Sequence, residues 1–284
     1  MSVVILPTPL VSTAWLAEHL GWPGLLPLDA SWYLPASGRD PHAEYRRAHI
    51  PGALFWDLDA LSRDDTDLPH MMPAPQRLAA ALGRMGIGND SAVVCYDGSG
   101  TNFSAARAWW MLRAIGHARA SVLDGGLSKW RAEGRPLTDR EPPLGAVTYT
   151  PAPRDDAFVG LERVHRAMEK GGSQLVDARS AGRFRGTEPE PRPGVRSGHI
   201  PGALNLPHAE LTAPDGTLLP AGALAERYRA AGIDLTRPVI ASCGSGVSAC
   251  ALVLGLEALG HKEHTVYDGS WTEWGGRDDT PIGR

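Results

Sequence analysis

The chain has 284 residues, of which 43% are hydrophobic and 21% charged, and its formal net charge is −4. This length suits two ordinary domains or one large one, and the composition is typical of a soluble globular protein. The weak negative charge gives no indication of nucleic acid or an anionic membrane as a partner, and no apolar run approaches the ~20 residues needed to span a bilayer.

Short apolar strands alternate with amphipathic helices along the chain. In the first half, the pattern predicts helices near Ser12–Leu20, Pro75–Met85 and Phe103–Ile115, and strands near Leu25–Asp29, Ala92–Tyr96 and Ser121–Leu123. In the second half, it predicts helices near Leu161–Lys170, Ala221–Ala230 and Val247–Leu259, and strands near Gln174–Asp177, Val239–Ser242 and Thr265–Tyr267. This alternation favours an α/β fold, with a mainly parallel sheet covered by helices on both faces.

The two halves repeat one another. The motif HIPGAL at His49–Leu54 recurs at His199–Leu204. Three other blocks recur in the same order: LPLDAS and QLVDARS, AVVCYDGSG and PVIASCGSG, and VLDGGLSKW and VYDGSWTEW. Such a long period indicates two tandem copies of one domain. We expect the first domain at residues 1–138, a proline-rich linker at 139–156 and the second domain at 157–284. His49 and His199 are expected to hold turns or strand edges.

The cysteines are Cys95, Cys243 and Cys250, an odd number without a CxxC pair. Neither a disulfide framework nor a thiol-rich zinc site is expected, and a reducing compartment is the simplest interpretation. The first 20 residues lack a basic segment and contain prolines within their apolar stretch, so they form a poor signal peptide. We therefore expect a cytoplasmic protein with no metal and no cofactor.

Cys243 lies on the most informative loop of the chain. It follows a predicted strand, and the glycine-spaced stretch Gly244–Gly246 leads into a predicted helix. The first N–H groups of a helix are unpaired and carry partial positive charge, so an anion or a thiolate is favoured there. Glycines let successive N–H groups turn inward. The alternative, a buried inert cysteine, is what we expect for Cys95 and Cys250, although Cys250 could also trap a persulfide as a disulfide.

The two copies differ at this loop. Asp97-Gly98-Ser99-Gly100 aligns with Cys243-Gly244-Ser245-Gly246. Because a carboxylate cannot perform sulfur chemistry, the first copy is expected to be non-catalytic. Ligands of parallel sheets lie beyond the carboxyl ends of the strands, which is where Cys243 is predicted.

The tandem HIPGA motifs, the DGG…W and DGS…W blocks and the single loop cysteine resemble the two-domain rhodanese-type sulfurtransferases, over essentially the whole chain. The loop CGSGVS at Cys243–Ser248 is similar to the CG(S/T)GVT of the 3-mercaptopyruvate sulfurtransferases, with Ser248 in place of threonine. Members that use thiosulfate usually carry basic residues directly after the cysteine. The resemblance implies two rhodanese-like domains and a sulfurtransferase activity.

The resemblance also implies roles for individual residues. Arg183 and Arg192 match the arginines that bind the substrate carboxylate. A guanidinium group can bind a planar carboxylate through two parallel hydrogen bonds. Without the resemblance, solvated surface arginines would be the simpler interpretation. Asp59, His70 and Ser245 match a hydrogen-bonded series of residues that transfers a proton in this family. The site would then contain residues from both sequence copies. The backbone of Gly244, Gly246, Val247 and Ser248 would stabilise the anionic sulfur.

The implied reaction has two halves. The Cys243 thiolate takes sulfur from 3-mercaptopyruvate and releases pyruvate, and the persulfide then passes its outer sulfur to cyanide, a small thiol or reduced thioredoxin. Thiosulfate is the alternative donor. We expect a monomer, because the duplication already supplies a pseudo-symmetric partner.

Other classes of protein also fit part of the pattern. Gly244–Ala249 matches the dinucleotide fingerprint GxGxxA, with Asp268 after the next strand. Against this, only 16 residues follow Asp268 and the repeats have no place in that fold. A cysteine phosphatase would need an arginine at the position of Ala249. An inactive binding module fits the first copy, but the second retains its cysteine.

Overall fold

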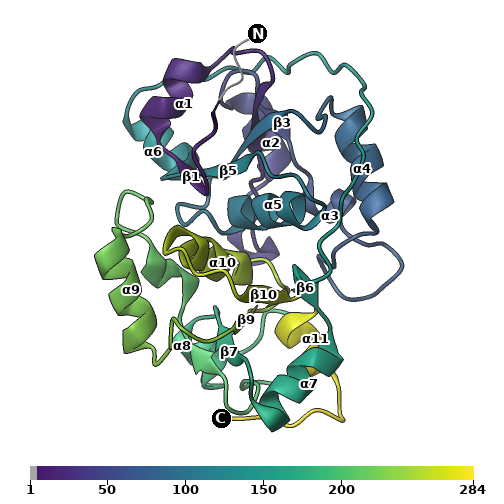
Figure 1. Ribbon diagram of the computed structural model, residues 1–284, viewed down its shortest axis with the longest axis vertical. Coiled ribbons are helices and arrows are strands. Elements are labelled where there is room, and N and C mark those ends of the chain that lie inside the picture. Colours follow the sequence, from purple (N-terminus) through teal and green to yellow (C-terminus); the bar gives the residue numbers. More distant parts are fainter. Residues whose placement is uncertain (1–4) are drawn as a thin grey trace. The chain divides into compact units, whose positions relative to one another are not determined.

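The computed structural model describes residues 5–284 (Figure 1), and residues 1–4 of the predicted first domain lie outside the described residues. The chain forms two compact units. Unit 1 comprises residues 5–61, Pro73–Arg154 and Pro214–Thr217, and unit 2 comprises Ser62–Met72, Asp155–Ala213 and Leu218–Arg284. Each unit therefore includes a short segment from the other sequence copy, and the predicted boundaries at 138 and 156 stay predictions.

Unit 1 is built on a parallel sheet. Among the described residues it has five strands in the order β1 (Leu10–Val11), β5 (Ala120–Leu123), β4 (Ala92–Tyr96), β2 (Leu25–Asp29) and β3 (Leu54–Phe55). Its helices are α1 (Thr13–His19), α2 (Pro41–Arg47), α3 (Leu58–Leu61), α4 (Pro75–Arg84), α5 (Phe103–Ala114) and α6 (Gly126–Ala132), with a 3-10 turn at Pro35–Ser37.

Unit 2 repeats this plan. Its described strands form a second five-stranded parallel sheet in the order β6 (Phe158–Val159), β10 (His264–Tyr267), β9 (Val239–Ser242), β7 (Gln174–Asp177) and β8 (Leu204–Asn205). Its helices are α7 (Leu161–Lys170), α8 (Ala181–Phe184), α9 (Ala221–Ala230), α10 (Ala249–Ala258) and α11 (Ser270–Gly276), with a 3-10 turn at His208–Leu211. The matching strand orders confirm the predicted duplication and the α/β fold.

The strands and helices predicted from periodicity are present, with small shifts at their ends. One shift concerns the cysteine loop. Helix α10 begins at Ala249, so the predicted start at Val247 was wrong. The N–H groups of Cys250 and Ala251 bond the carbonyls of Val247 and Ser248, three residues back. This tight first turn keeps Val247 and Ser248 in the loop.

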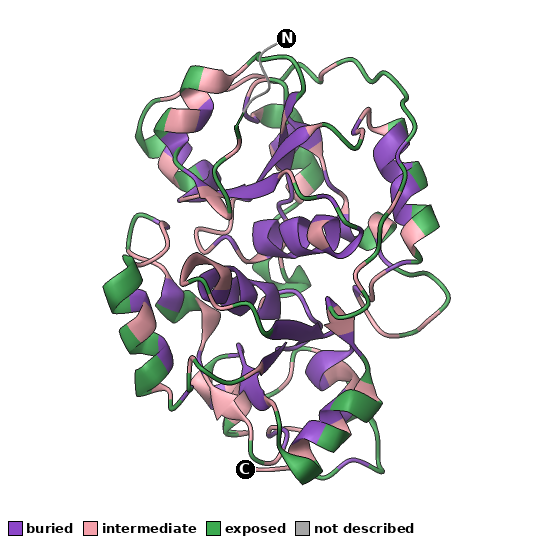
Figure 2. Ribbon diagram, in the orientation of Figure 1, coloured by how far each residue is buried: buried purple, intermediate pink, exposed green. Residues whose placement is uncertain are grey.

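The centre of each sheet is buried, and so is one helix beside it. Figure 2 shows α5 and α10 almost entirely in the colour of buried residues. α5 packs on β4 and β5, and α10 packs on β9 and β10. A helix that is apolar nearly all round is held by packing rather than by its own propensity. The loops that precede α5 and α10 are therefore held between a buried strand and a buried helix. Cys95 in β4 and Cys250 in α10 are both fully buried, as expected for packing residues.

The repeated histidines each pair with a segment distant in the sequence. His49 and Thr138 exchange backbone hydrogen bonds of 2.9 Å, and His199 pairs with Gly283 in the same way at 3.0 and 2.8 Å. The Nδ1 atom of His49 lies 2.7 Å from the carbonyl of Tyr45. These bridges agree with the prediction that the two histidines hold a turn or a strand edge. Within residues 5–284, no helix combines the length and the apolar character needed to cross a membrane.

Candidate active site

The cysteine loop is anchored through its carbonyl groups. The carbonyl of Cys243 accepts the Trp271 N–H at 2.9 Å, and the carbonyl of Gly244 accepts the N–H and hydroxyl of Thr272 at 2.8 and 2.6 Å. The N–H of Cys243 donates to Ser270 Oγ at 3.1 Å. Since C=O and N–H point in opposite directions across a trans peptide, the N–H groups of Gly244 and Ser245 point away from α11.

The N–H groups of this loop are available to a ligand. Within residues 5–284, those of Gly244, Ser245, Val247 and Ser248 have no hydrogen-bond acceptor. Gly246 has φ of +73°, a conformation that only glycine adopts cheaply, and it turns the chain toward α10. Unpaired N–H groups directly before a ten-residue helix form the kind of cradle that stabilises an anion. Cys243, at the start of this loop, is buried, with 2% of its surface exposed.

His70 lies against this loop. Its Nδ1 atom is 2.9 Å from Ser245 Oγ, and both side chains are buried. His70 has φ of +60°, which is unusual for a residue other than glycine. Two residues later, the Met72 N–H donates to Asp268 Oδ2 at 2.7 Å. Asp268 therefore ties the His70 segment to the end of β10, a role that sequence reasoning missed.

The predicted partner of His70 belongs to unit 1. Asp59 lies in α3, and its two carboxylate oxygens accept the indole N–H of Trp32, each at 3.2 Å. The structure thus brings Ser245 and His70 together within unit 2. The extension of this pair to Asp59 stays a prediction.

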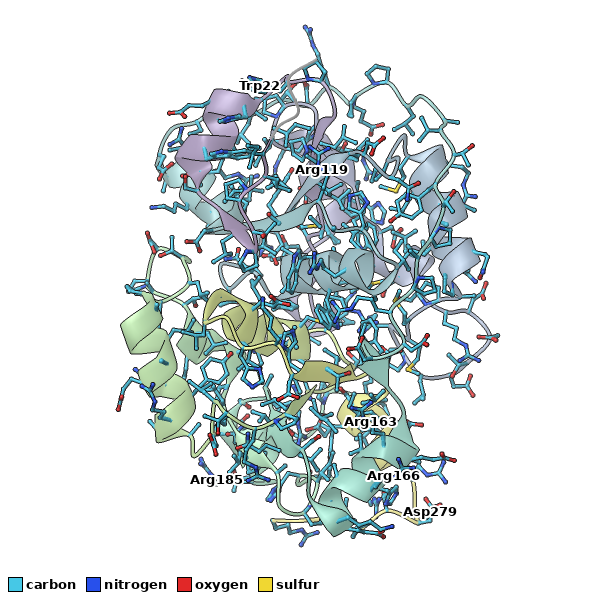
Figure 3. All side chains as sticks on the ribbon, in the orientation of Figure 1. Trp22, Arg119, Arg163, Arg166, Arg185 and Asp279 are labelled. Carbon is cyan, nitrogen blue, oxygen red and sulfur yellow. The ribbon has the colours of Figure 1, made fainter. Side chains whose placement is uncertain are left out.

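Arg183 in α8 also lies against the cysteine loop. A Cβ atom built on Gly244 would be 3.0 Å from Arg183 Nη2, so the guanidinium occupies the space that a side chain at 244 would need. Arg183 is 21% exposed. Arg185, two residues on, is exposed and labelled at the surface of the molecule in Figure 3. Arg192 is half-buried in the loop after α8, and its role in substrate binding stays a prediction.

A buried ionic network supports Arg183. Glu190 accepts from Arg183 Nη2 at 2.6 Å and from Arg179 Nη1 at 2.7 Å. Arg179 is fully buried and also donates to Asp177 at 2.6 Å. Burial opposes the charge of Arg179 most strongly, but the carboxylates of Asp177 and Glu190 more than offset it, so the pKa of Arg179 is raised. Sequence reasoning missed Arg179 and Glu190, although the repeat pair LPLDAS and QLVDARS could have shown the arginine at a buried strand end.

Asp97 occupies the equivalent loop of the first copy and fills it. Its Oδ1 accepts the N–H and hydroxyl of Ser99 at 2.8 and 2.5 Å. Its Oδ2 accepts the N–H and hydroxyl of Ser104, each at 3.0 Å, and the N–H of Ala105 at 2.9 Å. The carboxylate thus holds the loop and the first turn of α5 together. This agrees with the expectation that the first copy is non-catalytic.

Comparison with known proteins shows which family the chain belongs to. The profile of the family described as "Rhodanese-like domain" matches residues 12–133 and again 161–277. The chain belongs to the rhodanese family. It is 44% identical to the mitochondrial thiosulfate/3-mercaptopyruvate sulfurtransferase 1 of Arabidopsis thaliana, over 96% of this chain and 78% of that protein. It is 42% identical to the human 3-mercaptopyruvate sulfurtransferase, over 93% of this chain and 91% of that protein.

The solved structures agree with this assignment. The crystal structure of SseA from Escherichia coli, described as a 3-mercaptopyruvate sulfotransferase, superposes with a TM-score of 0.85 at 38% identity, covering 93% of this chain and 99% of that one. Both halves of this chain therefore have the rhodanese fold, as the sequence resemblance predicted. The dinucleotide alternative is excluded, since unit 2 has the rhodanese fold and the Asp268 carboxylate accepts the Met72 N–H.

Proposed function

We propose that this protein is a sulfurtransferase that moves sulfur from 3-mercaptopyruvate, through a persulfide on Cys243, to a thiol or cyanide, releasing pyruvate. One observation carries the proposal: Cys243 begins a loop with unpaired N–H groups, and the guanidinium of Arg183 lies against the next residue, Gly244. Membership of the rhodanese family and relatives named as 3-mercaptopyruvate sulfurtransferases support it.

The choice of donor follows from the space at residue 244. Because Gly244 has no side chain, Arg183 can approach the loop closely enough to bind a carboxylate whose own thiol reaches Cys243. A 3-mercaptopyruvate molecule carries such a carboxylate, and we propose Arg192 as its second partner. Thiosulfate, which is named for the Arabidopsis relative together with 3-mercaptopyruvate, is the competing donor.

In the first half-reaction the Cys243 thiolate attacks the thiol sulfur of the donor. The new S–S bond forms as the C–S bond breaks, and the electron pair of that bond remains on the substrate as pyruvate enolate. The enolate then takes a proton at its methylene carbon. We assign the Ser245–His70 pair, 2.9 Å apart, to delivering this proton, with Asp59 as the proposed third member.

In the second half-reaction an acceptor attacks the outer sulfur of the persulfide. The bond to Cys243 breaks, and its electron pair returns to the Cys243 thiolate, which the loop N–H groups stabilise. We propose a small thiol, cyanide or reduced thioredoxin as acceptor. We also propose that the protein acts as a monomer in a reducing, cytoplasmic setting, which suits its three free cysteines.

The test is turnover with each donor and cyanide as acceptor, followed by the formation of pyruvate and thiocyanate. We expect a higher kcat/KM with 3-mercaptopyruvate than with thiosulfate, and no turnover of either donor by Cys243→Ser. A preference for thiosulfate would overturn the donor assignment. Turnover of either donor by Cys243→Ser would overturn the mechanism.

A further inference from the structure

Glu190 lies directly behind the arginine that faces the cysteine loop. Its side chain is 4% exposed, and its two oxygens form a fork with Arg183: Oε2 accepts from Nη2 at 2.6 Å and Oε1 from Nε at 3.2 Å. This fork occupies one edge of the guanidinium. A substrate anion must therefore bind through the remaining N–H groups of Arg183, on Nη1 and Nη2, with the negative charge of Glu190 on the adjoining edge.

Glu190 is not free to swing away when an anion binds. Its Oε1 also accepts from Arg179 Nη1 at 2.7 Å. Arg179 is fully buried, donates to Asp177 and to the Gly198 carbonyl, and lies 4.5 Å from the ring centre of Trp271. Because Arg179 is held on several sides and donates to Glu190, the carboxylate of Glu190 has a fixed position.

The charges of this network balance. The carboxylates of Asp177 and Glu190 face the guanidinium groups of Arg179 and Arg183, so Arg183 does not present an uncompensated positive charge. A monoanion gains directional hydrogen bonds from Arg183 and meets little net repulsion. Each additional negative charge on the ligand gains less from Arg183, because the carboxylate of Glu190 on the adjoining edge of the guanidinium repels it in a partly buried site.

We propose that Glu190 is a specificity-determining residue of the donor site, which favours donors with a single carboxylate charge over dianionic donors. This inference rests on the proposed function and deepens it, since 3-mercaptopyruvate carries one carboxylate charge and thiosulfate carries two charges. Gly244 leaves room for Arg183 beside the cysteine loop, and Glu190 disfavours a second negative charge on the ligand that Arg183 binds.

The first experiment measures kcat/KM for both donors in Glu190→Gln, Glu190→Asp and Glu188→Gln. Glu188 is the matched control, because it is exposed in the same segment and accepts from the Ser180 hydroxyl at 2.7 Å. Glu190→Gln should shift the donor ratio toward thiosulfate by about tenfold or more. Glu190→Asp keeps the charge and should leave the ratio near that of the unaltered protein, as should Glu188→Gln. An equal change for both donors in Glu190→Gln would overturn the proposal.

A second measurement needs no turnover, and its first comparison needs no variant. Oxamate and oxalate have nearly the same size and shape, but oxamate carries one charge and oxalate two. Calorimetric titration of the unaltered protein should give tighter binding of oxamate, and Glu190→Gln should narrow or reverse the difference. Equal or tighter binding of oxalate by the unaltered protein would refute the role of Glu190. Absence of turnover with both donors would instead contradict the proposed function, which separates the two failures.

Discussion

His70 Nδ1 and Ser245 Oγ lie 2.9 Å apart, although 175 positions separate the two residues in the chain. The segment Ser62–Met72, which carries His70, belongs to the compact unit of the second sequence copy. The hydrogen bond from Met72 to Asp268 fixes this segment beside the cysteine loop. A residue from the first copy thereby becomes part of the candidate active site, and this relationship leads to the first prediction.

His70→Ala should lower kcat for 3-mercaptopyruvate by about 100-fold, because a positioned acid no longer protonates the enolate. KM should change little, since His70 is not assigned to the carboxylate. Steady-state kinetics on pyruvate release measures both constants. Ser245→Ala provides the matched control: if the two residues act as a pair, the double variant should be no slower than His70→Ala alone. Multiplicative losses would contradict the pairing.

Arg183→Ala should raise KM for 3-mercaptopyruvate by roughly 10- to 100-fold through loss of a charge-assisted fork. The comparison variant is Arg185→Ala, which removes the same side chain from an exposed position two residues away. Thermal denaturation should accompany the kinetics, because Arg183→Ala also leaves one edge of the buried Glu190 unpaired. Similar KM values for the two variants would argue against the carboxylate site.

Much of this site could be predicted from sequence because its signals are local. Cys243 lies between an apolar strand and an apolar helix, and glycines follow it in a motif that recurs in the other copy as the Asp97 loop. Glu190 could not be predicted, because its importance lies in pairings across a folded loop, and an isolated glutamate is usually a surface residue. The edge strands, such as Leu10–Val11, are too short to show periodicity.

Asp29 predicts a pH dependence of stability in unit 1. Burial, partly offset by hydrogen bonds with Ser31, raises the pKa of Asp29 from 3.8 to about 6. The folded state therefore holds this proton more tightly than the unfolded state. Its stabilising contribution is complete below pH 3.8 and is lost as the pH rises through 6.

Asp29→Asn should remove this dependence, because the amide keeps an oxygen for the Ser31 N–H and never ionises. We expect the variant to have a higher Tm than the unaltered protein at pH 7 to 8 and a similar one near pH 4, as measured by thermal denaturation across that range. A constant difference in Tm at every pH would show that ionisation of Asp29 is not the cause.

Gly216 lies in the segment Pro214–Thr217 that belongs to unit 1. It has φ of +82°, and a Cβ atom there would lie 3.1 Å from the Gly100 carbonyl and 3.3 Å from the Gly125 carbonyl. Gly216→Ala should lower the free energy of unfolding by about 1–3 kcal/mol. Gly202→Ala is the control, since Gly202 has a similar φ of +78° with nothing within 4 Å. Chemical denaturation measures the free energy of unfolding of both variants, and Gly216→Ala should lose more than Gly202→Ala. Equal losses would show that backbone strain, and not the contact with the two carbonyls, is the cause.

The most direct test of the account is the intact mass of the protein after brief exposure to 3-mercaptopyruvate without an acceptor, followed by peptide mapping. The account predicts the addition of one sulfur atom, located on Cys243, absent from Cys243→Ser and removed by cyanide. Cys95 and Cys250 are fully buried and should remain unmodified. An unchanged mass in a protein that still turns over the donor, or a sulfur located on another cysteine, would contradict it.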